Sequence, residues 1–102
     1  MIHYTVNVKV PDRLSAKFEA YMRRKHIPDV MATGRFVSSE FAKSDDGIYR
    51  TTYTAADRVD LDGYLENDAE RLRNAFAAEF PHEAKVRREI WESVEVWNAD
   101  QS

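Results

Sequence analysis

Residues 36–55 read FVSSEFAKSDDGIYRTTYTA, and this stretch decides the fold class. It contains two short runs rich in aromatic and β-branched residues, 36–43 and 48–55, with the segment SDDG between them at residues 44–47. Such runs favour strands, and a short polar segment ending in glycine is typical of a hairpin turn. The stretch therefore predicts two adjacent antiparallel strands in the middle of the chain.

A strand and a helix are predicted before this hairpin. Residues 2–10, IHYTVNVKV, alternate between apolar and polar side chains, which indicates a strand with one buried face. The Pro-Asp pair at residues 11–12 favours the start of a helix, and the basic cluster at residues 23–25 suits its last turn. Because proline disfavours helical geometry at the preceding residue, we expect a break before Pro28. Residues 29–34 then predict a short second helical turn, capped by its aspartate and stopped by its glycine.

A second helix and a last strand are predicted after the hairpin. From Asp57 or Asp60 onward, apolar residues form one continuous stripe as far as Phe80, and charged residues occupy the outer face. Pro81 ends this helix. Residues 84–97 alternate apolar residues with charges and predict a long final strand.

The order strand, helix, strand, strand, helix, strand predicts an α+β, ferredoxin-like βαββαβ fold. We expect a four-stranded antiparallel sheet with both helices on one face, in a single domain over residues 1–102. The 102 residues suffice for one hydrophobic core without disulfides, and two domains are excluded.

The helices can cover only one face of such a sheet, so the other face needs water or a partner. Alternation puts His3, Thr5, Asn7 and Lys9 of the first strand on this open face. On the third strand Tyr49, Thr51, Tyr53 and Ala55 should face the helices, because the opposite choice would bury Arg50.

The second and fourth strands carry large apolar groups on both faces, since Phe36 opposes Phe41 in parity and Ile90 opposes Trp91. This suggests burial on both sides, and the simplest second cover is another copy of the chain in an isologous homodimer. A charged residue in place of Trp91 is then expected to weaken the dimer.

Composition excludes several classes of protein. The net charge of −3 argues against a nucleic-acid partner, which usually needs a basic face. The chain has no cysteine, which excludes disulfides and thiolate chemistry. The longest apolar runs are a few residues and the start does not resemble a signal peptide, so we expect a cytoplasmic protein without membrane contact.

The segment YMRRKHIPDVMATGRF at residues 21–36 resembles the signature of a small bacterial family, the four-two-eight-six domain of unknown function. The opening strand IHYTVNV and the acidic helix DLDGYLENDAERLR at residues 60–73 extend the resemblance over nearly the whole chain. It implies a ferredoxin-like, dimeric α/β-barrel protein, and no established activity or functional residue comes with it.

A wider similarity concerns Tyr21, His26 and Pro28. They resemble the Tyr/Phe…His-x-Pro pattern of some dimeric α/β-barrel enzymes, including EthD-like proteins and muconolactone-type isomerases. In those relatives a histidine from this region can reach the pocket between helices and sheet. The similarity makes His26 a candidate catalytic residue here.

Four residues are candidate ligand contacts: His3, His26, Arg50 and Trp91. His26 titrates near neutral pH and suits proton transfer, although it can equally close the helix end. His3 and Arg50 on the open face could bind an anion or bridge a dimer. Trp91 could line a pocket for a planar ligand or lie in the dimer interface.

We expect no metal and no cofactor. The histidines lack metal-ligand spacing, and the three glycines cannot build a phosphate-binding loop. The leading hypothesis is a homodimeric α/β-barrel domain that binds a small ligand between sheet and helices. The alternatives are a cofactor-free isomerase or monooxygenase with His26 as general acid or base, and a structural or interaction module.

Overall fold

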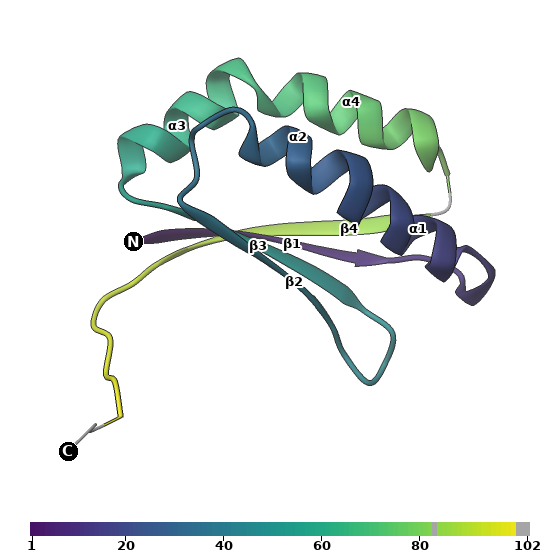
Figure 1. Ribbon diagram of the computed structural model, residues 1–102, viewed down its shortest axis with the longest axis horizontal. Helices are drawn as coiled ribbons and strands as arrows, with labels where there is room; N and C mark the ends of the chain where they lie inside the picture. Colours follow the sequence, from purple (N-terminus) through teal and green to yellow (C-terminus); the bar gives the residue numbers. More distant parts are fainter. Residues whose placement is uncertain (83, 100–102) are drawn as a thin grey trace.

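The computed structural model describes residues 1–82 and 84–99, and Figure 1 shows a helical layer above one sheet. The strands are β1 (Ile2–Lys9), β2 (Ser38–Lys43), β3 (Tyr49–Ala55) and β4 (Lys85–Glu92). The helices are α1 (Ser15–Tyr21), α2 (Ile27–Met31), α3 (Arg58–Asn67) and α4 (Ala69–Glu79). A 3₁₀ turn, η1 (Asp12–Leu14), precedes α1, and a π-helical turn, η2 (Met22–His26), joins α1 to α2.

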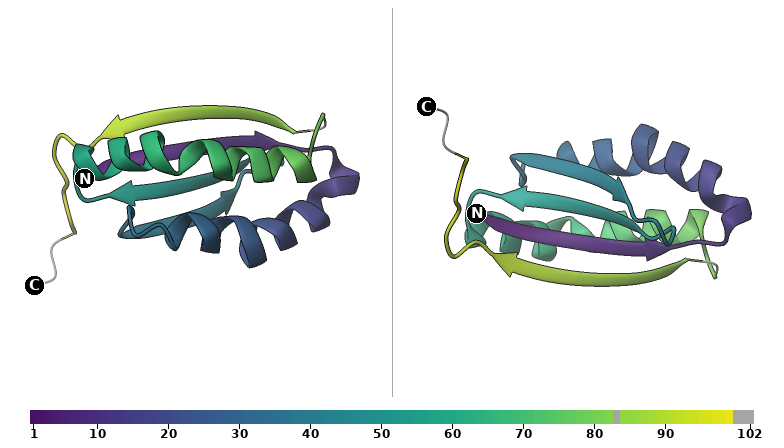
Figure 2. Two further views of the ribbon diagram at one scale, coloured as in Figure 1. Left: turned by 90° about the horizontal axis from the view of Figure 1, so that it is seen from above. Right: turned by 90° about the horizontal axis from the view of Figure 1, so that it is seen from below.

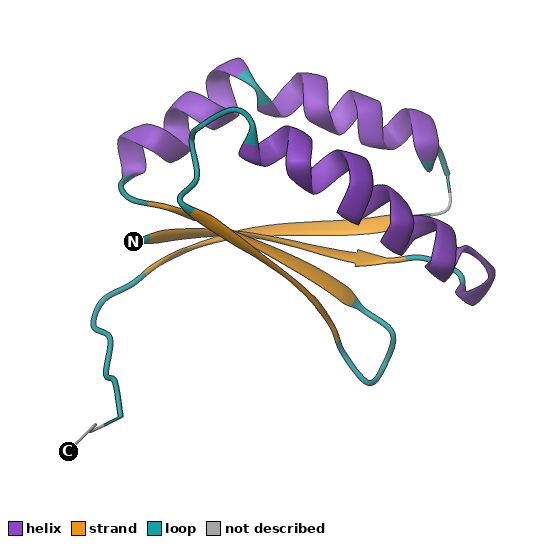
Figure 3. Ribbon diagram, in the orientation of Figure 1, coloured by secondary structure: helices purple, strands orange, loops and turns teal. Residues whose placement is uncertain are grey.

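The strands form one antiparallel sheet in the order β2-β3-β1-β4. Both helical segments lie on the same face of this sheet: the helices lie in front of the strands when seen from above and behind them when seen from below (Figure 2), and they form one layer over the strands in Figure 3. The predicted α+β, ferredoxin-like fold is confirmed. None of the helices in the described part of the chain is long and apolar enough to cross a membrane.

The core lies between the sheet and the helices. Phe18 of α1 is fully buried and its ring packs on Tyr49, Phe76 and Phe80 at centroid distances between 4.8 and 6.1 Å. Four residues of β3 that were predicted to face the helices are buried, namely Tyr49, Thr51, Tyr53 and Ala55. Side chains alternate between the faces of a strand, so Arg50, Thr52 and Thr54 lie on the open face.

The expected break before Pro28 is wrong, because the first helical segment continues through it. The chain widens into the π turn η2, where the amide of Ile27 donates to the carbonyl of Met22, five residues back. This wider turn gives room for the proline ring, whose missing N–H and clash with the carbonyl four residues back would otherwise disrupt an α-helix. Asp29 is not a cap: it lies in the first turn of α2 and its carboxylate is 2.9 Å from the ammonium of Lys25.

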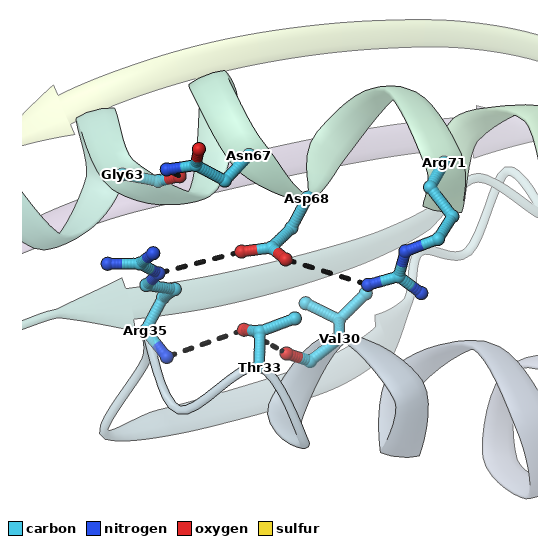
Figure 4. Close-up of polar contacts among 7 residues, drawn as sticks. All are labelled: Val30, Thr33, Arg35, Gly63, Asn67, Asp68 and Arg71. Atoms are coloured by element: carbon cyan, nitrogen blue, oxygen red, sulfur yellow. Dashed lines mark hydrogen bonds and ion pairs between the residues drawn. The ribbon is translucent and has the colours of Figure 1, made fainter.

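The second helical segment is not continuous as predicted. It breaks at Asp68, whose φ of −123° separates α3 from α4. The Asp68 carboxylate lies 3.5 Å from Arg35 Nε and 3.5 Å from Arg71 Nη2, so it bridges the loop before β2 and the second helical segment (Figure 4). The apolar stripe crosses this break without interruption, because Tyr64, Ala69 and Leu72 are all buried.

The last strand is shorter than the predicted 84–97. Its partner β1 begins at Ile2, which pairs with Glu92, and one more bond joins the Ser93 amide to the Met1 carbonyl. Beyond Ser93 there is no neighbouring strand to pair with, so β4 ends. The parity conflict at Phe36 also disappears, since this buried residue lies before β2 begins.

Gly63 gives a test of the contact between α3 and the loop before β2. A Cβ at Gly63 would lie 2.5 Å from Arg35 Nη1, so Gly63→Ala must displace that guanidinium. Alanine normally stabilises a helix interior by about 1 kcal/mol relative to glycine. We expect Gly63→Ala to give no gain in the native chain and a gain of about 1 kcal/mol in an Arg35→Ala background, measured by urea unfolding. Equal gains in both backgrounds would contradict this packing.

Candidate functional site

A cavity lies between the sheet and the helical layer, next to the π turn. Its walls come from six elements that meet there: Tyr4, Val6 and Val8 of β1, Met22 and His26 of η2, Tyr53 of β3, Tyr64 of α3, Arg73 and Phe76 of α4, and Val86 and Arg88 of β4. Its volume is about 30 Å³, which is room for about two water molecules. Arg73 and Arg88 are exposed, so they form the side on which the cavity can widen.

The inner wall of the cavity carries phenol groups. The ring of Tyr4 lies 6.3 Å from that of Tyr53 and 6.0 Å from that of Tyr64. Burial raises the pKa of Tyr64 to about 12, and burial also raises the pKa of Tyr53, with a further contribution from the two neighbouring phenols. Tyr53 and Tyr64 therefore stay neutral near pH 7 and can donate hydrogen bonds.

Tyr53 has a buried hydroxyl that makes no well-formed hydrogen bond. The residue is 2% exposed, and within residues 1–82 and 84–99 no group meets hydrogen-bond geometry at its Oη, although a contact with the Thr51 side chain opposes the rise in its pKa. An unpaired buried polar group costs about 1–3 kcal/mol, which makes this atom an exception among buried polar groups. A hydroxyl in this state, in the wall of a cavity, can donate to an acceptor atom placed in that cavity.

His26 lines the same cavity from the π turn. Its ring packs against Phe76 at 5.6 Å and stacks on Tyr21 at 6.0 Å. Burial lowers the pKa of His26 below its usual value, Asp29 opposes this shift, and the cation of Arg88 adds to it. The imidazole is therefore neutral near pH 7, and it has no hydrogen-bond partner in the part of the chain that the structure describes.

Two positive charges face this cavity, and none of the described carboxylates lines it. Arg73 reaches it from α4 and Arg88 from β4, and both lower the pKa of Tyr64, which places their charges near its hydroxyl. Arg88 faces the helices because it pairs with Val6, a residue on the same face of β1 as the buried Tyr4 and Val8.

The other three candidate residues lie on the opposite side of the sheet. His3, Arg50 and Trp91 surround a shallow hollow on the open face. The sheet separates this hollow from His26. His3 is held by Thr54 Oγ1 at 3.0 Å from its Nδ1 and by Ser93 Oγ at 2.9 Å from its Nε2. Arg50 donates from Nε to Asn7 Oδ1 over 2.8 Å. One chain therefore does not bring His26 together with the other three.

Sequence reasoning missed the tyrosines and arginines of the cavity. Alternation placed Tyr4 and Tyr53 toward the helices, but both were interpreted as core. The position of Arg88 could have been inferred from the sequence, because it alternates in step with Val86 and Ile90. This parity puts a cation on the helix-facing side of β4. No group of histidine and carboxylate side chains that could hold a metal exists among the described residues.

The sequence matches the family described as "Domain of unknown function (DUF4286)" over residues 1–94. The chain belongs to this family, as its resemblance to the family signature implied. No curated protein sequence matches the chain significantly.

Several solved structures share the fold. The cofactor-independent oxygenase SnoaB of Streptomyces nogalater is 13% identical, with a TM-score of 0.72 over 93% of this chain and 94% of that one. HapK of Hahella chejuensis is 14% identical, with a TM-score of 0.72 over 98% and 99%. The haem degrader MhuD of Mycobacterium tuberculosis, with two haems in its active site, is 13% identical, with a TM-score of 0.69 over 96% and 100%. At these identities the likeness establishes the fold.

The ionisation of His26 tests the electrostatics of the cavity. We expect a pKa below the usual value of about 6.5 in an NMR titration of the ring. The folded protein then binds this proton more weakly than the unfolded chain. The contribution of His26 to stability is therefore complete above the unfolded-state pKa of about 6.5 and is lost as the pH falls from there through the lower folded-state pKa.

Arg88→Gln removes a nearby cation and should raise the His26 pKa, whereas Arg87→Gln, on the other face of the same strand, should leave it unchanged. Asp29→Asn removes an opposing charge and should lower it further. If Arg88→Gln had no more effect than Arg87→Gln, the arginine would not face this cavity.

Proposed function

We propose that this member of the DUF4286 family binds a small organic molecule in the cavity between sheet and helices. The observation that carries the proposal is the Tyr53 hydroxyl in the cavity wall, a buried donor that meets no acceptor in hydrogen-bond geometry among the described residues. A ligand with an acceptor atom at this point would satisfy the hydroxyl and recover the free energy that its burial costs. The fold shared with SnoaB, a cofactor-independent oxygenase, and with MhuD, a haem degrader, is consistent with a ligand-binding role.

The walls indicate the chemistry of the ligand. Phe76, Tyr4 and Tyr64 offer ring surfaces, and Arg73 and Arg88 offer two positive charges at the widening side. A planar group that ends in a carboxylate or another anion would place its ring on the aromatic wall and its charge between the guanidinium groups. Because the cavity has room for only about two water molecules, a ring can enter only if the exposed side at Arg73 and Arg88 widens.

Benzoate and benzamide form a matched pair of probes, since they share a shape and differ in charge. We expect benzoate to bind more tightly than benzamide. Arg88→Gln should reduce this preference about tenfold, because it removes one charge-assisted hydrogen bond to the carboxylate.

Tyr53→Phe should weaken the binding of both probes. It should also raise the free energy of unfolding by about 1 kcal/mol, because it removes the unpaired hydroxyl. Calorimetric titration measures the affinities.

The control is Arg87→Gln, which removes a similar charge from the other face of β4. Equal loss in the Arg87 and Arg88 variants would mean that the probes bind elsewhere, and binding of neither probe at millimolar concentration would argue against the cavity as a ligand site.

Catalysis is the second candidate function. The neutral His26 imidazole in the cavity wall could accept a proton from a bound ligand, as a cofactor-free isomerase or monooxygenase requires. We favour binding, because a general base is usually oriented by a hydrogen bond to a third group, and His26 has none in the described part of the chain. A His26→Gln variant separates the two, since catalysis would be lost while probe binding remained.

We further propose that the open face of the sheet is covered by a second copy of the chain. Register aligns its side chains in rows across the strands. An acidic row contains Glu40, Thr52, Thr5 and Glu89, and the adjacent basic row contains Ala42, Arg50, Asn7 and Arg87. On either side lie an outer row of Ser38, Thr54, His3 and Trp91 and a lysine pair, Lys9 and Lys85.

These rows select one of two simple arrangements. If the two-fold axis ran along the strands, each row would lie over itself, and Glu40 would approach Glu89 of the second copy. If the axis runs across the strands, the acidic row of each copy lies over the basic row of the other, and Trp91 lies over the lysine pair. Glu89 of each copy then lies over Arg87 of the other, and no carboxylate of these rows meets another, so this second arrangement is favoured. We therefore infer a homodimer with β4 of one copy antiparallel to β4 of the other.

Charge reversal tests this arrangement. Arg87→Glu and Glu89→Arg should each weaken the dimer, because each puts like charges opposite one another across the interface. An equimolar mixture of the two variants should restore dimers, since each variant then supplies the charge that the other lacks. Sedimentation equilibrium measures the average mass in each case. A Glu89→Arg protein that dimerised more tightly than the native chain would indicate the other arrangement.

A further inference from the structure

A basic hollow lies at the end of the open face where β1 ends and β4 begins. Its volume is about 540 Å³ and its lining includes Lys9, Arg50, Lys85 and Arg87. No carboxylate of the described chain lines it, although the protein as a whole is acidic. Lys43 also borders it, but its ammonium lies over the Tyr49 ring, 5.3 Å from the centroid. We call this region the basic hollow.

The lysines of the hollow are in an unfavourable position. Lys9 and Lys85 face each other directly in the register of β1 and β4, and like charges at such a pair destabilise a sheet. Arg50 is bonded to Asn7, and Arg87 lies 3.7 Å from Glu89, but neither lysine has an ion pair or hydrogen bond among the described residues. An external carboxylate between the two lysines would relieve this repulsion.

An apolar arm leaves the domain at the opposite end of β4. After Ser93 the chain runs extended, away from the helices and on the side of the open face (Figure 1). In this arm Val94 is 99% exposed, Val96 68% and Trp97 79%. Exposed apolar side chains in such a cluster favour contact with another surface. Glu95 stands among them and supplies a carboxylate.

The arm cannot reach the basic hollow of its own chain. Lys85 and Glu92 mark opposite ends of β4, about 23 Å apart at the rise of an extended strand. Glu95 lies three residues beyond Glu92, which span about 10 Å when fully extended, so its carboxylate falls short of Lys9 and Lys85. Only a second molecule can bring Glu95 to these lysines.

We propose that the arm of each copy binds in the basic hollow of the other. This inference rests on the homodimer proposed above, in which β4 of one copy runs antiparallel over β4 of the other and the arm emerges at the partner's Lys85 end. Glu95 then lies near the Lys9 and Lys85 ammonium groups, and Trp97 covers apolar surface such as the exposed Ile48 at the border of the hollow. The exchange accounts for two features at once, the repelling lysines and the exposed arm.

Tryptophan fluorescence tests the exchange. A Trp91→Phe variant leaves Trp97 as the only tryptophan of the chain. On dimerisation we expect its emission to move to shorter wavelength and its quenching by acrylamide to fall roughly threefold, because the indole passes from solvent to an apolar contact. Lys85→Glu in the same background should abolish this protection, because the Glu95 carboxylate would meet a negative charge. Arg24→Glu, a reversal on the exposed side of η2, should leave it unchanged.

The outcomes separate this inference from the homodimer itself. Sedimentation equilibrium on the same samples reports the assembly. A dimer in which Trp97 is quenched as strongly as in the dilute monomer would overturn the exchange and leave the homodimer standing. A native chain, with Trp91 in place, that stays monomeric would overturn both, and protection of Trp97 in the monomer would overturn the exchange by showing that the arm folds onto its own chain.

Discussion

The whole structure depends on one constraint: a single layer of helices covers only one face of a four-stranded sheet. In this chain that constraint separates two environments that differ in chemistry. The covered face holds the core and a cavity with phenols, a neutral imidazole and two arginines at its rim. The open face holds polar rows and a basic hollow. Ligand binding belongs to the first environment in our account, and assembly belongs to the second.

The cavity exists because the helical layer is irregular at its centre. The π turn η2 brings His26 to the cavity wall, and the chain needs that turn to pass Pro28 without breaking the helix. On the opposite side, the break at Asp68 separates α3, which contributes Tyr64, from α4, which contributes Arg73 and Phe76. Both irregularities therefore lie in the segments that line the cavity.

Most of the fold could be predicted from the sequence, because strict alternation at residues 2–10 and the hairpin at 36–55 depend on local rules. The boundaries that failed depend on other parts of the chain. The end of β4 is set by the length of its partner β1, which no pattern in residues 84–97 reveals. The passage through Pro28 depends on a π turn, and the break at Asp68 coincides with ion pairs to Arg35 and Arg71 that the apolar stripe does not show.

The candidate site was harder to predict than the fold. Its residues come from β1, η2, β3, α3, α4 and β4, so only the packed structure shows that Tyr53 and Arg88 share one cavity. His26 was found through its similarity to a pattern, whereas His3, Arg50 and Trp91 were grouped with it although the sheet separates them. Parity already places His3 and Arg50 on the open face, but the facing of Trp91 on β4 stayed open until the register of β4 with β1 was known.

The central claim is that a second copy covers the open face while the cavity on the other face takes a small molecule. Native mass spectrometry of the protein, purified gently from cells, reports assembly and retained ligand in one measurement. The account predicts a species at twice the 11.9 kDa chain mass, together with a population that carries additional mass of one small molecule per chain. A bare monomer over the whole micromolar range would contradict it.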